Sequence, residues 1–242
     1  MTMQVGMVGT DGVLIASDTK STDMLRISPR EQPYRPRHTF DASKIILNHV
    51  RGIAVSCARV TATARRIAEH IFSELRDQDL PYPCEPIKQI GEALLPKLGD
   101  DDLLKDAHCL IATVLPIPSL YLFHYGNDVD GNWGANCTKM RSTIAAGDHV
   151  NAAIFWKERY YQRKSIKSLV PLAAHLVVSA SMLNSGSIGG LEIVLCDASG
   201  LHRIAEDSIR KLEAKANKWD EEIGSMFANY RQHFTFAPKD AG

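Results

Sequence analysis

The chain has 242 residues, of which 45% are hydrophobic and 23% are charged, and its formal net charge is zero. This composition predicts a globular protein with a large core, and the charge balance gives no reason to expect nucleic acid as a partner. No apolar run approaches the about 20 residues of a membrane span, and no charged region precedes an apolar signal segment. We therefore expect a cytoplasmic protein without membrane contact, and the lack of repeats and linkers predicts one domain over residues 1–242.

Two short apolar runs at the start of the chain predict a β-hairpin. Gln4–Val8 and Val13–Ala16 flank the sequence GTDG at 9–12, and an Asp-Gly pair between β-rich runs is typical of a tight turn. Only Met1 and Thr2 precede the first run, and a small second residue normally allows the initiator methionine to be cleaved. We therefore expect Thr2 to carry a free α-amine at the end of a buried strand.

A threonine in that position carries a nucleophile and a base in one residue. Its hydroxyl is a weak nucleophile, but the α-amine, with an unperturbed pKa of about 8, can accept the hydroxyl proton directly or through a water. The alternative is that the short N-terminus has no chemical role.

The rest of the chain alternates between strand-like and helix-like segments. The polar, proline-containing residues 21–40 are expected to form a loop, and residues 125–137 a Gly- and Asn-rich excursion. Apolar runs predict strands at 44–48, 52–57, 109–115, 120–124, 142–146 and 191–196. Helical spacing or composition predicts helices at 58–75, 87–98, around 152–156, 165–181 and 204–227.

The order of these motifs resembles the proteasome β-type, HslV-like family of N-terminal nucleophile hydrolases. Thr2 is followed by the hairpin, by Asp18 and Thr22 in SDTKST, by Lys44 in DASKIILN, and by a turn into a helix in VSCARVTATARRIAEHIF. The likeness covers most of residues 2 to about 196 and leaves an extra C-terminal helical segment at about 204–242. It implies an α+β fold, a four-layer αββα sandwich of two antiparallel sheets, in subunits that form homo-oligomeric stacked rings around a chamber.

The resemblance also implies a set of site residues. The catalytic residues would be Thr2, Asp18, Lys44, Asp148 and Ser185. The backbone N–H of Arg59 would hold the oxyanion, and the substrate pocket would include Ser21, Thr22 and Cys57. Without the resemblance, a lysine at the head of an apolar strand is typical of an edge position with its ammonium in water.

Three positions depart from the family pattern. Arg59 stands where the family has paired glycines, which crowds the oxyanion site. Asp148 replaces a serine and would raise the pKa of the α-amine. Met182 replaces the aspartate that precedes the Ser-Gly pair, so Ser185 could equally be a serine of a core turn.

The sequence predicts neither a metal nor a cofactor. The cysteines are far apart and predict reduced, structural thiols at Cys57, Cys84, Cys109, Cys137 and Cys196. The acidic run at 100–102 predicts a solvated turn rather than a metal site. The basic run at 157–167 predicts a surface or subunit contact, with nucleic-acid binding as the weaker alternative.

These features predict a threonine-type endopeptidase acting on peptides or unfolded proteins through an acyl-ester on Thr2, and an ATPase unfoldase is a possible partner. Two alternatives keep the same fold. The departures from the family pattern favour a non-catalytic scaffold or gating subunit, and a small-amide amidase would use the same nucleophile on another substrate.

Overall fold

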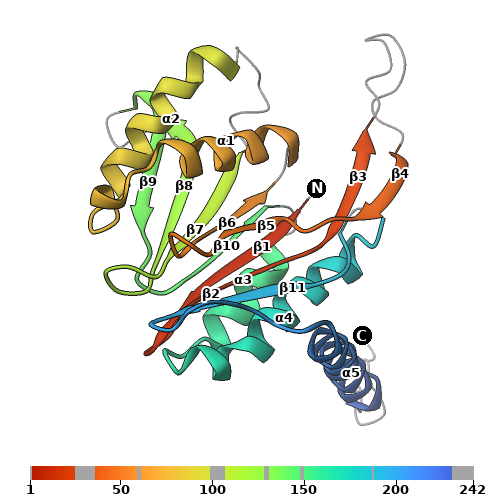
Figure 1. Ribbon diagram of the computed structural model, residues 1–242. Helices are drawn as coiled ribbons and strands as arrows, with labels where there is room; N and C mark the ends of the chain where they lie inside the picture. The colour runs from red at the N-terminus through yellow and green to blue at the C-terminus, as the bar shows by residue number, and fades with distance from the viewer. Residues whose placement is uncertain are drawn as a thin grey trace, which may run out of the picture.

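Two antiparallel sheets lie face to face, and helices cover both outer faces (Figure 1). The computed structural model describes residues 2–24, 36–58, 61–98, 107–127, 131–147, 150–186 and 188–230. The predicted α+β fold, a four-layer αββα sandwich of two antiparallel sheets, is confirmed for this part of the chain.

Each sheet has five strands. The first has the order β10-β1-β2-β11-β12, formed by Thr143–Gly147, Met3–Val8, Gly12–Ser17, Glu192–Asp197 and Gly200–Arg203. The second has the order β5-β6-β7-β8-β9, formed by Ile45–Asn48, Ile53–Ala58, His108–Thr113, Ser119–Asn127 and Trp133–Lys139. A separate two-stranded ribbon pairs β3, Lys20–Met24, with β4, Pro36–Asp41.

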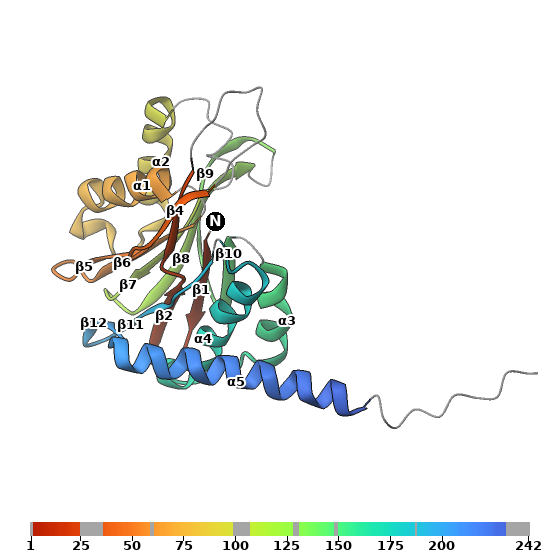
Figure 2. The same ribbon diagram turned by 90° about the vertical axis from the view of Figure 1, so that its right-hand side faces the viewer.

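Helices α1 (Thr61–Glu74) and α2 (Cys84–Leu98) cover the second sheet, with the short 3-10 turn η1 (Asp77–Asp79) between them. Helices α3 (Val150–Tyr160) and α4 (Ile166–Leu183) cover the first sheet. The long helix α5 (Glu206–Tyr230) packs on α4 and lies along the outside of this layer (Figure 2).

Alternation along β1 places its side chains in two different layers. Met3, Val5 and Met7 belong to the core shared with α4. Gly6 faces the other way, because a Cβ there would lie 2.7 Å from Leu120 of the second sheet. The Gln4 amide also crosses between the sheets and donates to the carbonyl oxygen of His108 at 3.1 Å. Gln4 and Gly6 therefore face the space between the two sheets.

Two segments expected to be irregular contain strands. The loop predicted at 21–40 begins and ends in β3 and β4, which form an edge ribbon that tolerates Pro36 at the first position of a strand. The excursion predicted at 125–137 contains the end of β8 and most of β9. This prediction was wrong because β9 is an edge strand in which Ala135 and Cys137 pack against the helical layer, where Gly91 of α2 lets Ala135 approach closely.

Helix α4 is, by length and composition, long and apolar enough to cross a membrane, which the sequence analysis did not single out. In the structure 61% of its residues are buried, and it packs between β1 and α5. Burial of this kind is typical of the core helix of a folded domain.

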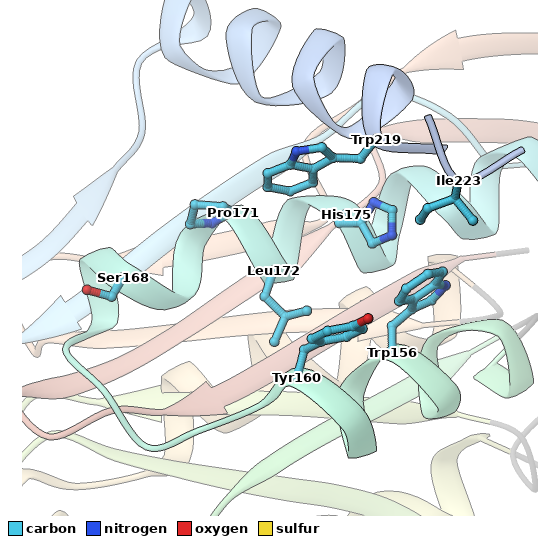
Figure 3. A pocket seen from close by; sticks show the side chains of 8 residues that line it. All are labelled: Trp156, Tyr160, Ser168, Pro171, Leu172, His175, Trp219 and Ile223. Carbon is cyan, nitrogen blue, oxygen red and sulfur yellow. The ribbon is translucent and has the colours of Figure 1, made fainter. Parts of the chain in front are cut away.

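A pocket of about 380 Å³ opens between α3, α4 and α5 (Figure 3). The His175 ring lies between Trp156 and Trp219 and meets both edge to face. Burial lowers the pKa of His175, and the nearby Asp220 carboxylate opposes that effect. The imidazole is therefore neutral in the folded protein over a pH range in which it is protonated in the unfolded chain.

We expect the free energy of unfolding to decrease as the pH is lowered past about 6.5. In that range His175 binds a proton in the unfolded chain but not in the folded state. A His175→Phe variant lacks this contribution. The stability of the wild type relative to the variant should therefore decrease between about pH 7.5 and pH 5, by at most about 1.4 kcal/mol per pH unit. Urea unfolding of both proteins at the two pH values measures the difference, and a difference independent of pH would contradict the neutral state.

Candidate active site

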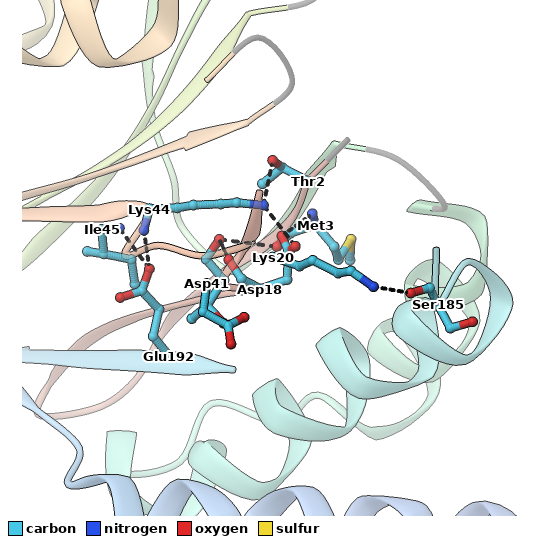
Figure 4. A network of polar contacts seen from close by, with 11 residues as sticks. Thr2, Met3, Asp18, Lys20, Asp41, Lys44, Ile45, Ser185 and Glu192 are labelled. Atoms are coloured by element: carbon cyan, nitrogen blue, oxygen red, sulfur yellow. Dashed lines mark hydrogen bonds and ion pairs between the residues drawn. The ribbon is translucent and has the colours of Figure 1, made fainter. Parts of the chain in front are cut away.

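Thr2 lies at the entry to β1, fully buried, where the ends of three strands meet (Figure 4). The main chain next to it is fixed on both sides. Asp18 N donates to Met3 O at 3.1 Å, and Met3 N donates to Asp18 Oδ1 at 2.9 Å. On the opposite side Gly147 of β10 has φ +110, and a Cβ there would lie 2.0 Å from Thr2 O. Only glycine fits this approach.

Lys44 joins Thr2 to Asp18. Its Nζ lies 3.0 Å from Thr2 Oγ1 and 2.8 Å from Asp18 Oδ2, and the side chains of the ion pair are 1% and 0% exposed. The three residues come from the start of β1, the end of β2 and the segment before β5. The ammonium donates to the hydroxyl oxygen, so its charge favours the deprotonated form of that oxygen.

Burial raises the pKa of the Asp18 carboxyl, and Lys44 together with N–H groups of Met3 and Gly189 opposes the rise. A carboxylate in this position is stable only while these donors remain, because a buried charge without a partner is costly. Asp18 and Lys44 therefore act as one unit, and removing either changes the other.

Ser185 is not placed beside Thr2. Its carbonyl oxygen accepts a hydrogen bond from Lys20 Nζ at 2.5 Å, while its side chain points away from Lys44 and is exposed (Figure 4). The residue follows α4, which ends at Leu183, and the turn directs the backbone rather than the hydroxyl toward the site. Ser185 therefore lies in an exposed turn rather than in the core turn of the alternative.

Of the predicted substrate-pocket residues, Ser21 lies near the start of β3. It is buried, and within the described residues its Oγ has no hydrogen-bond partner. Cys57 instead faces the helical layer on the second sheet, where its Sγ lies 4.0 Å from Cys109 Sγ. Alternation along β6 turns Ser56 and Ala58, not Cys57, toward the first sheet, so the pocket role of Cys57 stays a prediction.

Other predicted features fall on parts of the chain that the structure does not describe. Arg59, Asp148 and the side chain of Thr22 lie outside the described residues. The acidic run at 100–102 lies outside them too. Among the residues that are described, no group of three or more His, Cys, Asp or Glu side chains could hold a metal ion, and the five cysteines are free thiols.

Sequence reasoning missed Glu192, a buried carboxylate on β11 that accepts hydrogen bonds from the backbone N–H groups of Lys44 and Ile45. The available signal was a single charge at the head of the apolar run LEIVLC. It also missed Gly189, whose N–H helps to hold Asp18 and whose carbonyl accepts from Thr19 and Lys20.

Comparison with solved structures gives a match over the whole chain. The protein is similar to Anbu (ancestral beta-subunit) from Yersinia bercovieri, with a TM-score of 0.67 and 15% sequence identity, over 98% of this chain and 100% of that chain. The chain has the proteasome β-like fold. No protein-family model matches the sequence, and a search of curated proteins gives no match. At 15% identity the match establishes the fold, so the chemistry must be argued from the residues.

In this proteasome-like fold, Gly147 is the close neighbour of Thr2, and a Gly147→Ala substitution should displace the entry to β1. Gly200→Ala is the matched control, because Gly200 also has a positive φ of +129 but nothing lies within 4 Å of its Cβ position. Both variants should lose about 1–2 kcal/mol of unfolding free energy through backbone strain. Gly147→Ala should lose about 1–3 kcal/mol more through the clash.

Chemical denaturation measures both losses, and amide exchange at Met3 reports the local displacement. Equal losses in the two variants, with unchanged exchange at Met3, would show that Gly147 does not fix the position of Thr2.

Proposed function

We propose that the protein is a threonine-type endopeptidase subunit that acts through an acyl-ester on Thr2 after Met1 is removed. The observation that carries this proposal is the Lys44 ammonium, 3.0 Å from the Thr2 hydroxyl oxygen and 2.8 Å from Asp18. A buried ammonium that donates to a threonine oxygen activates that oxygen as a nucleophile. The similarity in fold to an ancestral beta-subunit supports the same reading.

In the proposed reaction the α-amine freed by loss of Met1 accepts the Thr2 hydroxyl proton, directly or through water. The bond from Thr2 Oγ1 to the peptide carbonyl carbon forms, and backbone N–H groups near Arg59 hold the resulting oxyanion. The carbon–nitrogen bond then breaks, and the leaving amine takes the proton from the α-amine. Water hydrolyses the ester, which restores Thr2 and releases the second product.

The proposal extends to the setting of the reaction. Subunits would assemble into homo-oligomeric stacked rings in the cytoplasm, so that peptides or unfolded proteins reach Thr2 only inside a chamber. An ATPase unfoldase would deliver folded substrates. These expectations rest on the resemblance in sequence, with support from the similarity in fold.

A second candidate is a non-catalytic subunit of the same fold. The departures from the family pattern at Arg59, Asp148 and Met182 favour it. The two candidates differ in whether Met1 is removed in the cell-made protein, because an amine blocked by methionine cannot serve as the base.

Treatment with a peptide epoxyketone, an electrophile that needs both a hydroxyl and an adjacent amine, should give a morpholine adduct on Thr2 that mass spectrometry detects. Thr2→Ala should abolish both the adduct and the hydrolysis of fluorogenic peptides, while Thr2→Ser should keep part of both. Peptide hydrolysis that survives Thr2→Ala, in protein whose N-terminus is confirmed, would rule the proposal out. An intact Met1 and no adduct on the wild type would favour the non-catalytic subunit.

Lys44→Met should lower peptide hydrolysis by about 100-fold or more, because it removes the charge beside Thr2 Oγ1. It should also cost about 3 kcal/mol of unfolding free energy, because Asp18 is left buried without its ion-pair partner. The Lys44→Met, Asp18→Asn double variant is the control that separates these effects. Its stability should recover while its activity stays low, and recovery of activity would show that the ammonium has no direct part in the reaction.

A further inference from the structure

A buried polar network on β11 holds the main chain at Lys44. Glu192 is 5% exposed, and its Oε1 accepts hydrogen bonds from Lys44 N at 2.5 Å and from Ile45 N at 2.9 Å. Its Oε2 accepts from Ser43 Oγ at 2.8 Å. One carboxylate of the first sheet therefore binds three consecutive residues that lead into the second sheet (Figure 4).

Arg203 of the neighbouring strand β12 completes the network. Its guanidinium forms an ion pair with Glu192 Oε2, donates to Ser43 Oγ at 3.2 Å, and donates to Ile45 O at 2.9 Å. The charge of the carboxylate is thus compensated by a cation, two backbone N–H groups and a hydroxyl. Compensation of this kind is what makes a buried carboxylate stable.

The network fixes one end of the Lys44 side chain, while Asp18 fixes the other. A lysine stem has four carbons and many rotamers, so a contact at Nζ alone leaves the rest of the side chain free to move. Glu192 anchors the backbone from which the stem leaves, and Asp18 holds the ammonium at 2.8 Å. With both ends held, Nζ stays within 3.0 Å of Thr2 Oγ1.

We infer that Glu192, supported by Arg203, is a positioning residue that places the Lys44 ammonium against the Thr2 hydroxyl. Glu192 acts through the backbone of Lys44 and touches neither Thr2 nor Asp18 among its described contacts. The inference rests on the proposed function for its kinetic consequence. Its geometric consequence, the location of the ammonium, can be measured without any activity.

Glu192→Gln keeps an oxygen that can accept from both backbone N–H groups but places an amide NH₂ against Arg203. Arg203→Met removes the cation and leaves Glu192 without its ion-pair partner. The double variant lets the new amide donate to Ser43 Oγ without a facing guanidinium. The control is Asp77→Asn, which breaks the ion pair at 2.9 Å between Arg51 and Asp77, the first residue of η1, away from Lys44.

The experiment measures the rate of Thr2 labelling by a peptide epoxyketone against pH, the NMR titration of the Lys44 ammonium, and the midpoint of urea unfolding. Glu192→Gln should label Thr2 at least 10-fold more slowly. Its pH–rate profile should move toward higher pH, because an ammonium displaced from Thr2 no longer favours the neutral amine. The Lys44 titration should shift as well. The double variant should recover part of the rate, and the control should behave as the wild type.

A merely structural role for Glu192 would lower the unfolding midpoint and leave the pH–rate profile and the Lys44 titration unchanged, and that result would overturn the inference. If the wild type is not labelled at all, the proposed peptidase fails, but a shifted Lys44 titration in Glu192→Gln still supports the positioning role. If the wild type is labelled and Glu192→Gln matches it in rate, profile and titration, the positioning role fails alone.

Discussion

The buried ion pair of Lys44 and Asp18 is the constraint on which the rest of the site depends. Both side chains are almost fully buried, and the ammonium nitrogen lies 2.8 Å from the carboxylate oxygen. Removing two charges from water costs several kcal/mol for each ion. That cost is offset only if the geometry is close and the remaining carboxylate lone pairs and ammonium protons have hydrogen-bond partners. The N–H groups of Met3 and Gly189 and the hydroxyl of Thr2 meet this condition, so the ends of β1 and β2 and the segment before β5 must converge.

The β1–β2 hairpin and the neighbouring glycine explain how the chain reaches this convergence. Antiparallel pairing sets Gln4 opposite Ser17, which brings Met3 and Asp18 together one step further along the two strands. Gly147 lets β10 approach the carbonyl of Thr2 more closely than any side chain would permit. The register of the strands therefore brings the site residues together. The chain has this proteasome β-like fold although it is only 15% identical to its structural match.

Features that depend on residues close together in the sequence could be predicted, whereas contacts between residues far apart in the sequence could not. The first hairpin follows from the local signal of Asp11-Gly12, and helices such as α4 follow from periodicity. Lys44 could be assigned only through the resemblance, because a lysine at the head of a strand has no specific meaning alone. The contacts of Glu192 with Lys44 span 148 residues, and no local pattern encodes them. The face of β6 on which Cys57 lies is equally hard to predict, because one step along a strand reverses the face.

The polar network at Glu192 joins the two sheets. Apolar side chains of similar volume often stabilise such a contact as well as an ion pair does, because they avoid the desolvation of two charges. An apolar residue on β11 could fill the space, but it could not accept hydrogen bonds from Lys44 N and Ile45 N, and two buried N–H groups would lose their partners. The carboxylate thus fixes the orientation of the main chain at Lys44 and Ile45 as well as its distance from β11. Because Arg203 lies three residues before α5, the outermost helix is connected through one short strand to the lysine at the centre of the site.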